Sequence, residues 1–261
     1  MVGLSEAVLL GALQGMTEWL PVSSSGHLAL AQTLLGLQLP LLFDVALHAG
    51  TLLAALAFFW KDIWKMVAAV AKFDFKSEYG RLAAMVALGT VPLAAAGLLF
   101  RDAIAALFNS PLAIGTSMLL MGMILYITKF SRGDRAVGAA DALFVGAAQA
   151  LALMPGISRS GTTIAAGLSR HINRQKAFLF SFMLSVPAVV GANVYELYKT
   201  GSGGVAVIGI ETVAAVAVAA VVGYGSIGLL KRVFESKRLH MFAYYCWVVG
   251  LAVVAYSYLF L

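Results

Sequence analysis

Long apolar runs recur from one end of this chain to the other, and they limit the folds open to it. Of its 261 residues 61% are hydrophobic and 11% are charged, whereas a soluble globular domain is about a quarter charged. Because the signal covers the whole chain, a soluble domain with an N-terminal anchor is excluded. Residues 1–15 carry Glu6 and no basic cluster, which is a poor start for a cleaved signal peptide. We therefore expect an integral membrane protein of α-helices, with these residues in the mature fold.

Charge clusters, glycines and prolines divide the chain into ten apolar segments. A spanning helix needs about 20 residues, and six segments reach or approach that length. The other four are shorter or broken by polar motifs, and they come as two pairs. We predict an all-α membrane protein with six transmembrane helices plus two re-entrant helical hairpins, and a loop over 61–81. The segments are 4–20, 25–37, 41–60, 82–100, 111–128, 137–154, 161–170, 177–198, 205–230 and 240–260, of which the first two and the sixth and seventh form the hairpins.

The basic residues test this arrangement, because cytoplasmic loops are enriched in Lys and Arg. With the two hairpins re-entrant, only Arg101 and Lys199 fall on the side opposite the loop 61–81, and Arg159 lies within the second hairpin. The chain then begins and ends on the outer side. The fifteen residues predicted to be cytoplasmic are Lys61, Lys65, Lys72, Lys76, Arg81, Lys129, Arg132, Arg135, Arg170, Arg174, Lys176, Lys231, Arg232, Lys237 and Arg238.

An internal repeat accompanies the hairpins. We predict one membrane domain, 1–261, with a first repeat over 1–130 and a second over 136–261. Each half holds one hairpin and three spans, and three is odd, so the second half must be inverted. Inverted repeats place a polar site near the bilayer midplane. At an offset of 135 residues, the residues Gly11, Ala12, Gln14, Ser23, Ser25 and Gly26 match Gly146, Ala147, Gln149, Ser158, Ser160 and Gly161.

The two hairpins carry polar residues that together indicate an anion site. In the first, Gln14 and Glu18 share a helical face, Pro21 and Gly26 flank a predicted turn of three serines, and His27 opens the next helix. In the second, Arg159 lies in the turn. Each turn leads into a helix N-terminus, which favours anions, and a guanidinium suits phosphate. The hydroxyls predicted to bind phosphate are those of Ser23, Ser24, Ser25, Ser158, Ser160, Thr162 and Thr163.

Glu18 and His27 are the candidates for general acid–base or nucleophilic chemistry, and Glu18 is also a candidate ligand for a divalent cation. Asp44 and His48, four residues apart, are predicted to border the site. Structural alternatives stay open: Glu18 and His27 as an interhelical polar pair, Arg159 as a helix cap, and hydroxyls bonded within their own helices. Cys246, the single cysteine, excludes an intrachain disulfide. No separate basic domain is present, so nucleic acid is not an expected partner.

Three runs closely resemble the undecaprenyl-pyrophosphate phosphatase family of the bacitracin-resistance type: EWLPVSSSGH (residues 18–27), FDVALHAGT (43–51) and PGISRSGTT (155–163). The resemblance covers nearly the whole chain. It implies hydrolysis of a polyprenyl pyrophosphate to the monophosphate and phosphate at the outer face of the plasma membrane, which recycles the lipid carrier of cell-wall glycan synthesis. Its motif residues match Glu18, Ser23, Ser24, His27, Ser158, Arg159 and Ser160 in this chain.

The resemblance also implies a divalent cation, magnesium or calcium, with Glu18 and Gln14 as its candidate ligands. Many members carry a second glutamate where this chain has Gln14, so metal affinity is expected to differ. The expected partners are the polyprenyl pyrophosphate substrate and membrane lipids, and a homodimer is left open. Ser24, His27 and a metal-activated water all remain candidate nucleophiles.

Two other functions were weighed. Acid-phosphatase-like lipid phosphatases require a histidine six residues after their S-R arginine, but Ala165 stands there and the next histidine is His171. A non-enzymatic polyprenyl-phosphate carrier or flippase stays open, because inverted hairpin repeats are a transporter architecture. Transport needs no nucleophile or general acid, so Glu18 and His27 favour the enzyme.

Overall fold

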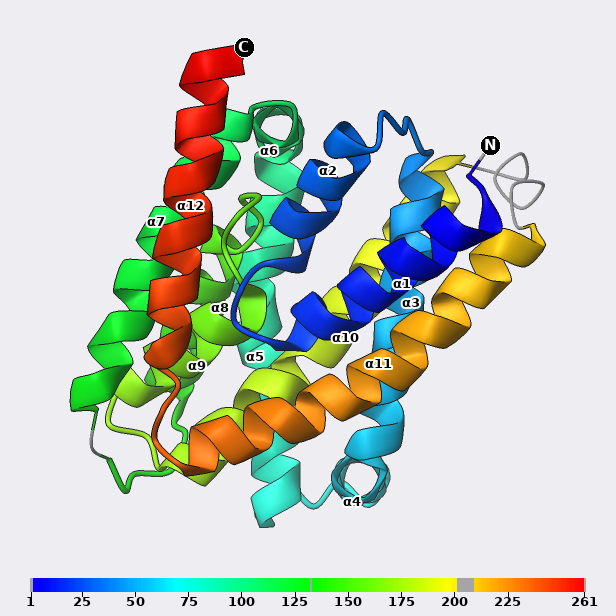
Figure 1. The fold of residues 1–261 in the computed structure, drawn as a ribbon. Helices are drawn as coiled ribbons and strands as arrows, with labels where there is room; N and C mark the ends of the chain where they lie inside the picture. The colour runs from blue at the N-terminus through cyan, green and yellow to red at the C-terminus, as the bar shows by residue number, and fades with distance from the viewer. Residues whose placement is uncertain (1, 132, 201–208, 261) are drawn as a thin grey trace.

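The computed structural model describes residues 2–131, 133–200 and 209–260, and these residues form twelve α-helices and no β-strand (Figure 1). A single turn of 3-10 helix, Thr128–Phe130, extends the seventh helix. The helices are α1 (Leu4–Trp19), α2 (Ser24–Leu34), α3 (Leu41–Phe58), α4 (Trp60–Ala71), α5 (Glu78–Leu99), α6 (Arg101–Phe108), α7 (Pro111–Ile127), α8 (Ala139–Leu151), α9 (Arg159–Ser169), α10 (Arg174–Thr200), α11 (Ile210–Glu235) and α12 (Met241–Phe260).

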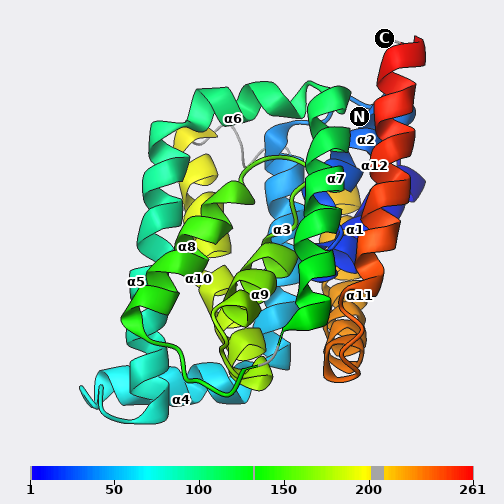
Figure 2. The same cartoon turned by 90° about the vertical axis from the view of Figure 1, so that its left-hand side faces the viewer.

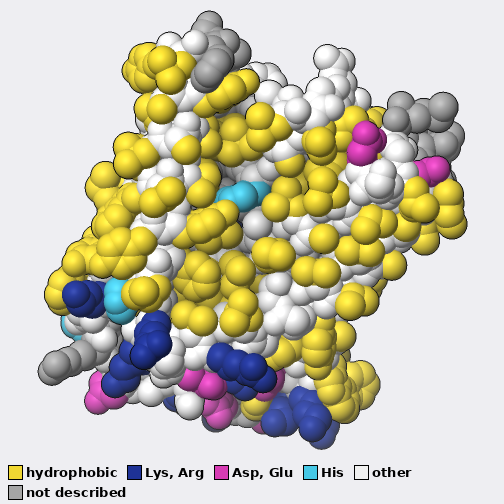
Figure 3. All heavy atoms as spheres, in the orientation of Figure 1, with side chains coloured by type: hydrophobic (Ala, Val, Ile, Leu, Met, Phe, Trp, Pro, Cys, Tyr) yellow, Lys and Arg dark blue, Asp and Glu magenta, His cyan; other side chains and the backbone are white. Residues whose placement is uncertain are grey.

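Six of these helices are long and apolar enough to cross a membrane, namely α3, α5, α7 with its 3-10 turn, α10, α11 and α12. These helices coincide with the six spans predicted from the sequence, so that prediction is confirmed. At most half of the residues in any of these spans are buried inside the protein. The outward side chains are apolar, as Figure 3 shows for one face, and this surface suits contact with lipid chains. The chain is a multi-pass membrane protein.

Two short helices, α4 and α6, were missed by the sequence analysis. The prediction of a loop over 61–81 was wrong, because Trp60–Ala71 is helical. Figure 2 shows α4 and α6 lying across opposite ends of the bundle. No residue of α4 is buried, and Trp64 is 68% exposed. The charged residues Lys61, Asp62 and Lys65 interrupt the first half of this helix, so a search for uninterrupted apolar runs reads it as a loop.

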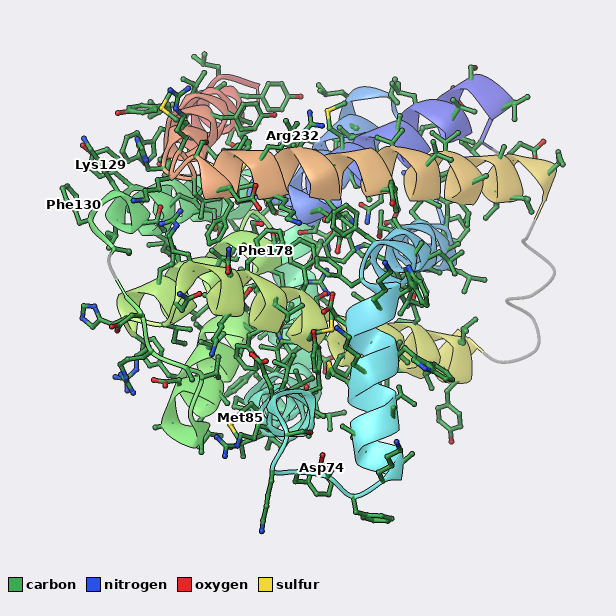
Figure 4. The ribbon with its side chains drawn as sticks, turned by 90° about the horizontal axis from the view of Figure 1, so that it is seen from below. Asp74, Met85, Lys129, Phe130, Phe178 and Arg232 are labelled. Atoms are coloured by element: carbon green, nitrogen blue, oxygen red, sulfur yellow. The ribbon has the colours of Figure 1, made fainter. Side chains whose placement is uncertain are left out.

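Basic side chains gather at the end of the bundle where α4 lies (Figure 3). Figure 4 views the molecule from this end. It labels Asp74 between α4 and α5, Lys129 on the 3-10 turn and Arg232 on α11. The start of α1 and the end of α12 lie at the opposite end (Figure 1). This arrangement agrees with the predicted sidedness of the chain. Arg132, assigned to the basic side, lies outside the described residues.

Cysteine labelling tests the orientation of the bundle. Lys72 and Asn109 are both exposed and lie at opposite ends, after α4 and after α6 respectively. An impermeant thiol reagent added to intact cells should label Asn109→Cys and should reach Lys72→Cys only after the cells are permeabilised. Native Cys246 is buried, so the unsubstituted protein is the control. Labelling at position 72 with protection at position 109 would reverse the orientation.

The helix pairs α1/α2 and α8/α9 have 16, 11, 13 and 11 residues, and none of them is among the six spans. Glu6 accepts a hydrogen bond from the Gly3 N–H at the start of α1, and Asp141 accepts one from the Gly138 N–H at the start of α8. These contacts match at the offset of 135 residues. The re-entrant course of the pairs and the inverted repeat remain predictions, which the matched caps favour.

Packing of the two helix pairs also follows the offset. A Cβ at Gly11 would meet the Ala215 carbonyl of α11, and a Cβ at Gly146 would meet the Gly89 carbonyl of α5. Glycine at these two positions therefore lets each pair approach a long helix of the other half at backbone contact. Helix α1 of the first pair thus packs on α11, and α8 of the second pair packs on α5. This packing brings the two polar turns into the interior of the bundle.

Candidate active site

The turns of the two helix pairs meet in the interior of the bundle. The Gly156 N–H donates to Ser23 Oγ at 3.1 Å, and Ser160 Oγ donates to the Trp19 carbonyl at 2.9 Å. Ser23 and Ser160 are both buried. Residues 133 and 141 positions apart in the sequence thus form one polar centre, as expected from the sequence.

Both turns end earlier in the polar motif than predicted. Ser23 Oγ accepts from the Gly26 N–H and Ser158 Oγ accepts from the Gly161 N–H, each at 3.3 Å, so the first serine of each motif is the helix N-cap. Ser24 and Arg159 are therefore the first residues of α2 and α9. The predicted turn of three serines, with Arg159 in the second turn, is corrected accordingly.

His27 is likewise the fourth residue of α2 rather than its first. The N-cap Ser23 has φ of 71°, in the left-handed region, so its backbone turns sharply into the helix. This turn places Ser24, the next residue, beside the last turn of α1.

Glu18 is the centre of the site. Its carboxylate, 7% exposed, binds groups from four helices. Oε1 accepts from Arg159 Nη2 at 2.5 Å, and Oε2 accepts from Ser24 Oγ at 2.5 Å and from Gln14 Nε2 at 3.0 Å. His48 Nε2 lies 3.6 Å from Oε2. The candidate catalytic residues Glu18, Ser24 and Arg159 are thus in direct contact.

Arg159 is held by further contacts that the sequence did not indicate. Its Nη1 donates to the Ser185 carbonyl of α10 at 3.2 Å, and its guanidinium lies over the Trp19 ring, 5.6 Å from the centroid. Trp19 in turn stacks on Phe182. A guanidinium has five N–H donors, so others remain for an incoming anion. Trp19 was visible only as the neighbour of Glu18, and no sequence signal pointed to Ser185.

His27 does not contact Glu18 in the described structure. Its Nδ1 lies 2.7 Å from the Ser23 carbonyl oxygen, and its Nε2 lies 2.7 Å from the hydroxyl of Tyr245 on α12. The expected pairing of Glu18 with His27 is therefore replaced by the pairing of Glu18 with His48. Tyr245 carried no sequence signal, since it is one of several tyrosines in an apolar run.

Of the two residues predicted to border the site, His48 contacts Glu18 and Asp44 contacts α2 instead. His48 reaches Glu18, and its Nδ1 lies 2.8 Å from the Asp44 carbonyl oxygen. The Asp44 carboxylate instead accepts from Gln32 Nε2 of α2 at 2.8 Å. Asp44 therefore fastens α3 to α2, and His48 provides the polar border.

The remaining hydroxyls lie around this centre and bond mostly within the protein. Ser25 Oγ lies 3.3 Å from Ser23 Oγ, and Ser158 Oγ lies 3.2 Å from Ser160 Oγ. Thr162 is packed against Met121, and Thr163 Oγ1 donates to the Arg159 carbonyl. Their predicted binding of phosphate stays a prediction. In this structure the threonines support α9 rather than face Glu18.

Oxygen ligands for a divalent cation are present beside Glu18. Gln14 Oε1 is buried and has no hydrogen-bond partner, while its Nε2 binds the Glu18 carboxylate. Carboxylate and amide oxygens suit magnesium and calcium. No group of three or more His, Cys, Asp and Glu side chains gathers at a metal-binding distance within the described ranges. Gln14 and Glu18 thus fit a cation that takes its remaining ligands from phosphate and water.

Comparison with known proteins gives one consistent family. The family model described as bacitracin resistance protein BacA matches residues 7–252. An undecaprenyl-diphosphatase of Desulforapulum autotrophicum is 39% identical over 95% of this chain and 96% of the relative. One of Methanosphaera stadtmanae is 38% identical over 98% and 99%, and one of Desulfosudis oleivorans is 41% identical over 94% and 95%.

Proposed function

Since the chain belongs to the bacitracin resistance protein BacA family, we propose that it is an undecaprenyl-diphosphatase, an enzyme that hydrolyses undecaprenyl pyrophosphate to undecaprenyl phosphate and phosphate. The relatives described above match this chain over nearly their whole length and are named for this activity. One observation carries the proposal: Glu18 joins Ser24 to Arg159, a guanidinium from the other helix pair. Carboxylate, hydroxyl and fixed cation are the groups that phosphoryl transfer uses.

Arg159 binds the diphosphate in this proposal. Without substrate its charge is balanced by Glu18. A diphosphate brings more negative charge than one carboxylate, and guanidinium binds phosphate oxygens in pairs. Substrate phosphate oxygens therefore replace Glu18 as the acceptor of Arg159 N–H groups. The Ser185 carbonyl and the Trp19 ring keep the guanidinium in place. The N-terminus of α2 adds backbone N–H groups near the same point.

Ser24 is the nucleophile and Glu18 its base. Ser24 Oγ attacks the terminal phosphorus, the bond from that phosphorus to the bridging oxygen breaks, and undecaprenyl phosphate leaves. The Oγ proton passes to Glu18, which already accepts it in a hydrogen bond. Water then attacks the phosphorus of the phosphoserine and the bond from phosphorus to Ser24 Oγ breaks. Oγ takes back the proton held by Glu18, and the proton lost by the water leaves with the released phosphate. Once the diphosphate takes over the Arg159 Nη2 donor, Glu18 is a stronger base, because its carboxylate loses a charge-assisted hydrogen bond.

A divalent cation held by Gln14 and Glu18 would supply charge neutralisation on the phosphate oxygens. We further propose that the protein lies in the plasma membrane with this centre opening to the outer face, where the product re-enters lipid-carrier recycling. That side is the one opposite the basic end of the bundle. The homodimer stays a prediction.

Phosphate release tests the proposal. Purified protein in detergent, given undecaprenyl pyrophosphate with magnesium, should release inorganic phosphate, and Ser24→Ala should release almost none. The variant Ser236→Ala, at the exposed end of α11, is the matched control and should equal the wild type. A wild type that binds the lipid without releasing phosphate would favour the carrier function instead.

Gln14→Glu tests the cation ligands. A second carboxylate strengthens a hard-cation site, so this variant should stay active and need a lower magnesium concentration for its half-maximal rate. The measurement is a magnesium titration of phosphate release. Gln38→Glu, at an exposed position between α2 and α3, is the control for the added charge. An unchanged magnesium requirement in Gln14→Glu would show that position 14 does not face the cation.

A further inference from the structure

His27 has both ring nitrogens engaged by the protein. A carbonyl oxygen only accepts hydrogen bonds, so Nδ1, 2.7 Å from the Ser23 carbonyl, carries a hydrogen. This contact leaves Nε2 as the one ring atom through which His27 can gain or lose a proton. Whatever faces Nε2 therefore controls how His27 can act.

Tyr245 is the group that faces Nε2. Its hydroxyl lies 2.7 Å from that atom, and the two rings stack with centroids 5.7 Å apart and planes 13° apart. A tyrosine hydroxyl can donate to a neutral imidazole and can accept from a charged one. The contact therefore survives a change of protonation at Nε2, and the stacked ring fixes the plane of the imidazole in both states.

The position of Tyr245 is itself fixed against the turn after α1. The next residue, Cys246, is fully buried, and its Sγ lies 3.6 Å from the Pro21 carbonyl oxygen. Trp247 Nε1 donates to the Leu119 carbonyl of α7 at 3.2 Å. Tyr245, by contrast, is 44% exposed, so its hydroxyl is not packed in the core. Packing in the core therefore does not account for the Tyr245 hydroxyl, whereas its contact with His27 does.

We propose that Tyr245 is a positioning residue for His27. It holds the imidazole plane and the Nδ1–H tautomer, and it keeps Nε2 oriented toward the position of a phosphate oxygen of the substrate. The inference rests on the proposed function. Tyr245 has no contact with Glu18 or Arg159 among the described interactions, so it acts through His27.

Tyr245→Phe removes the hydroxyl and keeps the stacked ring. We expect kcat to fall by about tenfold, the effect of losing one orienting hydrogen bond, with KM nearly unchanged. Tyr244→Phe is the matched control, because Tyr244 is the preceding tyrosine and contacts the Tyr126 and Trp247 rings; it should keep the wild-type kcat. In a His27→Gln background, Tyr245→Phe should cause no further loss. Equal losses in both backgrounds would show that Tyr245 does not act through His27.

A chemical measurement separates this inference from the proposed function. Diethyl pyrocarbonate modifies unprotonated imidazole nitrogens, and in the wild type both nitrogens of His27 are engaged. Tyr245→Phe frees Nε2, so mass spectrometry should show faster modification of His27 in this variant and an unchanged rate in Tyr244→Phe. Equal rates in wild type and Tyr245→Phe would overturn the positioning role. A wild type without phosphatase activity would overturn the proposed function instead, and the modification rates would still report on the contact.

Discussion

Arg159→Lys is expected to lower kcat/KM by about 10²-fold or more, although it keeps the positive charge. Lysine cannot donate to Glu18 and the Ser185 carbonyl from one planar group, as Arg159 does. It also loses the flat face that lies over Trp19. Because the charge acts on bound substrate as well as on the transition state, both KM and kcat should deteriorate. Steady-state phosphate release measures the two constants.

Arg170→Lys is the matched control for this substitution. Arg170 also pairs with a buried carboxylate, since its Nε donates to Asp141 at 2.9 Å, but it lies at the far end of α9. The control should retain the wild-type kcat/KM. If Arg159→Lys were equally active, the guanidinium fork would have no part in binding the diphosphate, and the proposed role of Arg159 would be wrong.

Glu18→Gln is expected to lower kcat by about 10²- to 10⁴-fold, the usual range for loss of a general base. The amide keeps the shape of the side chain but cannot take the Ser24 proton. At saturating magnesium KM should not rise, because Arg159 no longer has a carboxylate competing with the diphosphate. This combination of a low kcat with an unchanged or lower KM distinguishes loss of the base from loss of binding.

Two controls accompany Glu18→Gln. Glu6→Gln changes a half-buried glutamate at the opposite end of the same helix and should leave both constants unchanged. Removing Glu18 also leaves the buried Arg159 charge unpaired, which is destabilising, so the thermal midpoint of the variant in detergent should be measured with and without substrate. Substrate should recover part of any lost stability. A Glu18→Gln variant with wild-type turnover would exclude Glu18 as the base.

The sequence predicted the six spans and the residues that gather at the polar centre for two different reasons. The six spans follow from the length of their apolar runs, a property of each segment alone. Glu18, Ser24 and Arg159 were selected because charged and hydroxyl side chains at membrane depth need partners. The structure gives them those partners in one another. Local composition was sufficient in both cases.

What the sequence did not predict depends on packing between distant segments. Tyr245 meets His27 across 218 positions, and Ser185 meets Arg159 through its backbone, which has no residue signature. The helix starts at Ser24 and Arg159 depend on which serine becomes the N-cap, and a run of serines offers several. The helix α4 was missed because its aromatic residues are separated by charges.

Trapping of a phosphorylated enzyme tests the central claim most directly, namely that Ser24 attacks phosphorus with Glu18 as its base. Purified wild-type protein would be mixed with undecaprenyl pyrophosphate labelled in the terminal phosphate and quenched within a single turnover. One half would be quenched with acid, which preserves phosphoserine, and the other with alkaline denaturant, which preserves phosphohistidine, and both would be digested for mass spectrometry. The account predicts labelled phosphate on Ser24, a strong decrease of the label in Glu18→Gln, and no label in Ser24→Ala. Phosphate release with no label on the protein, or with the label on His27, would contradict it.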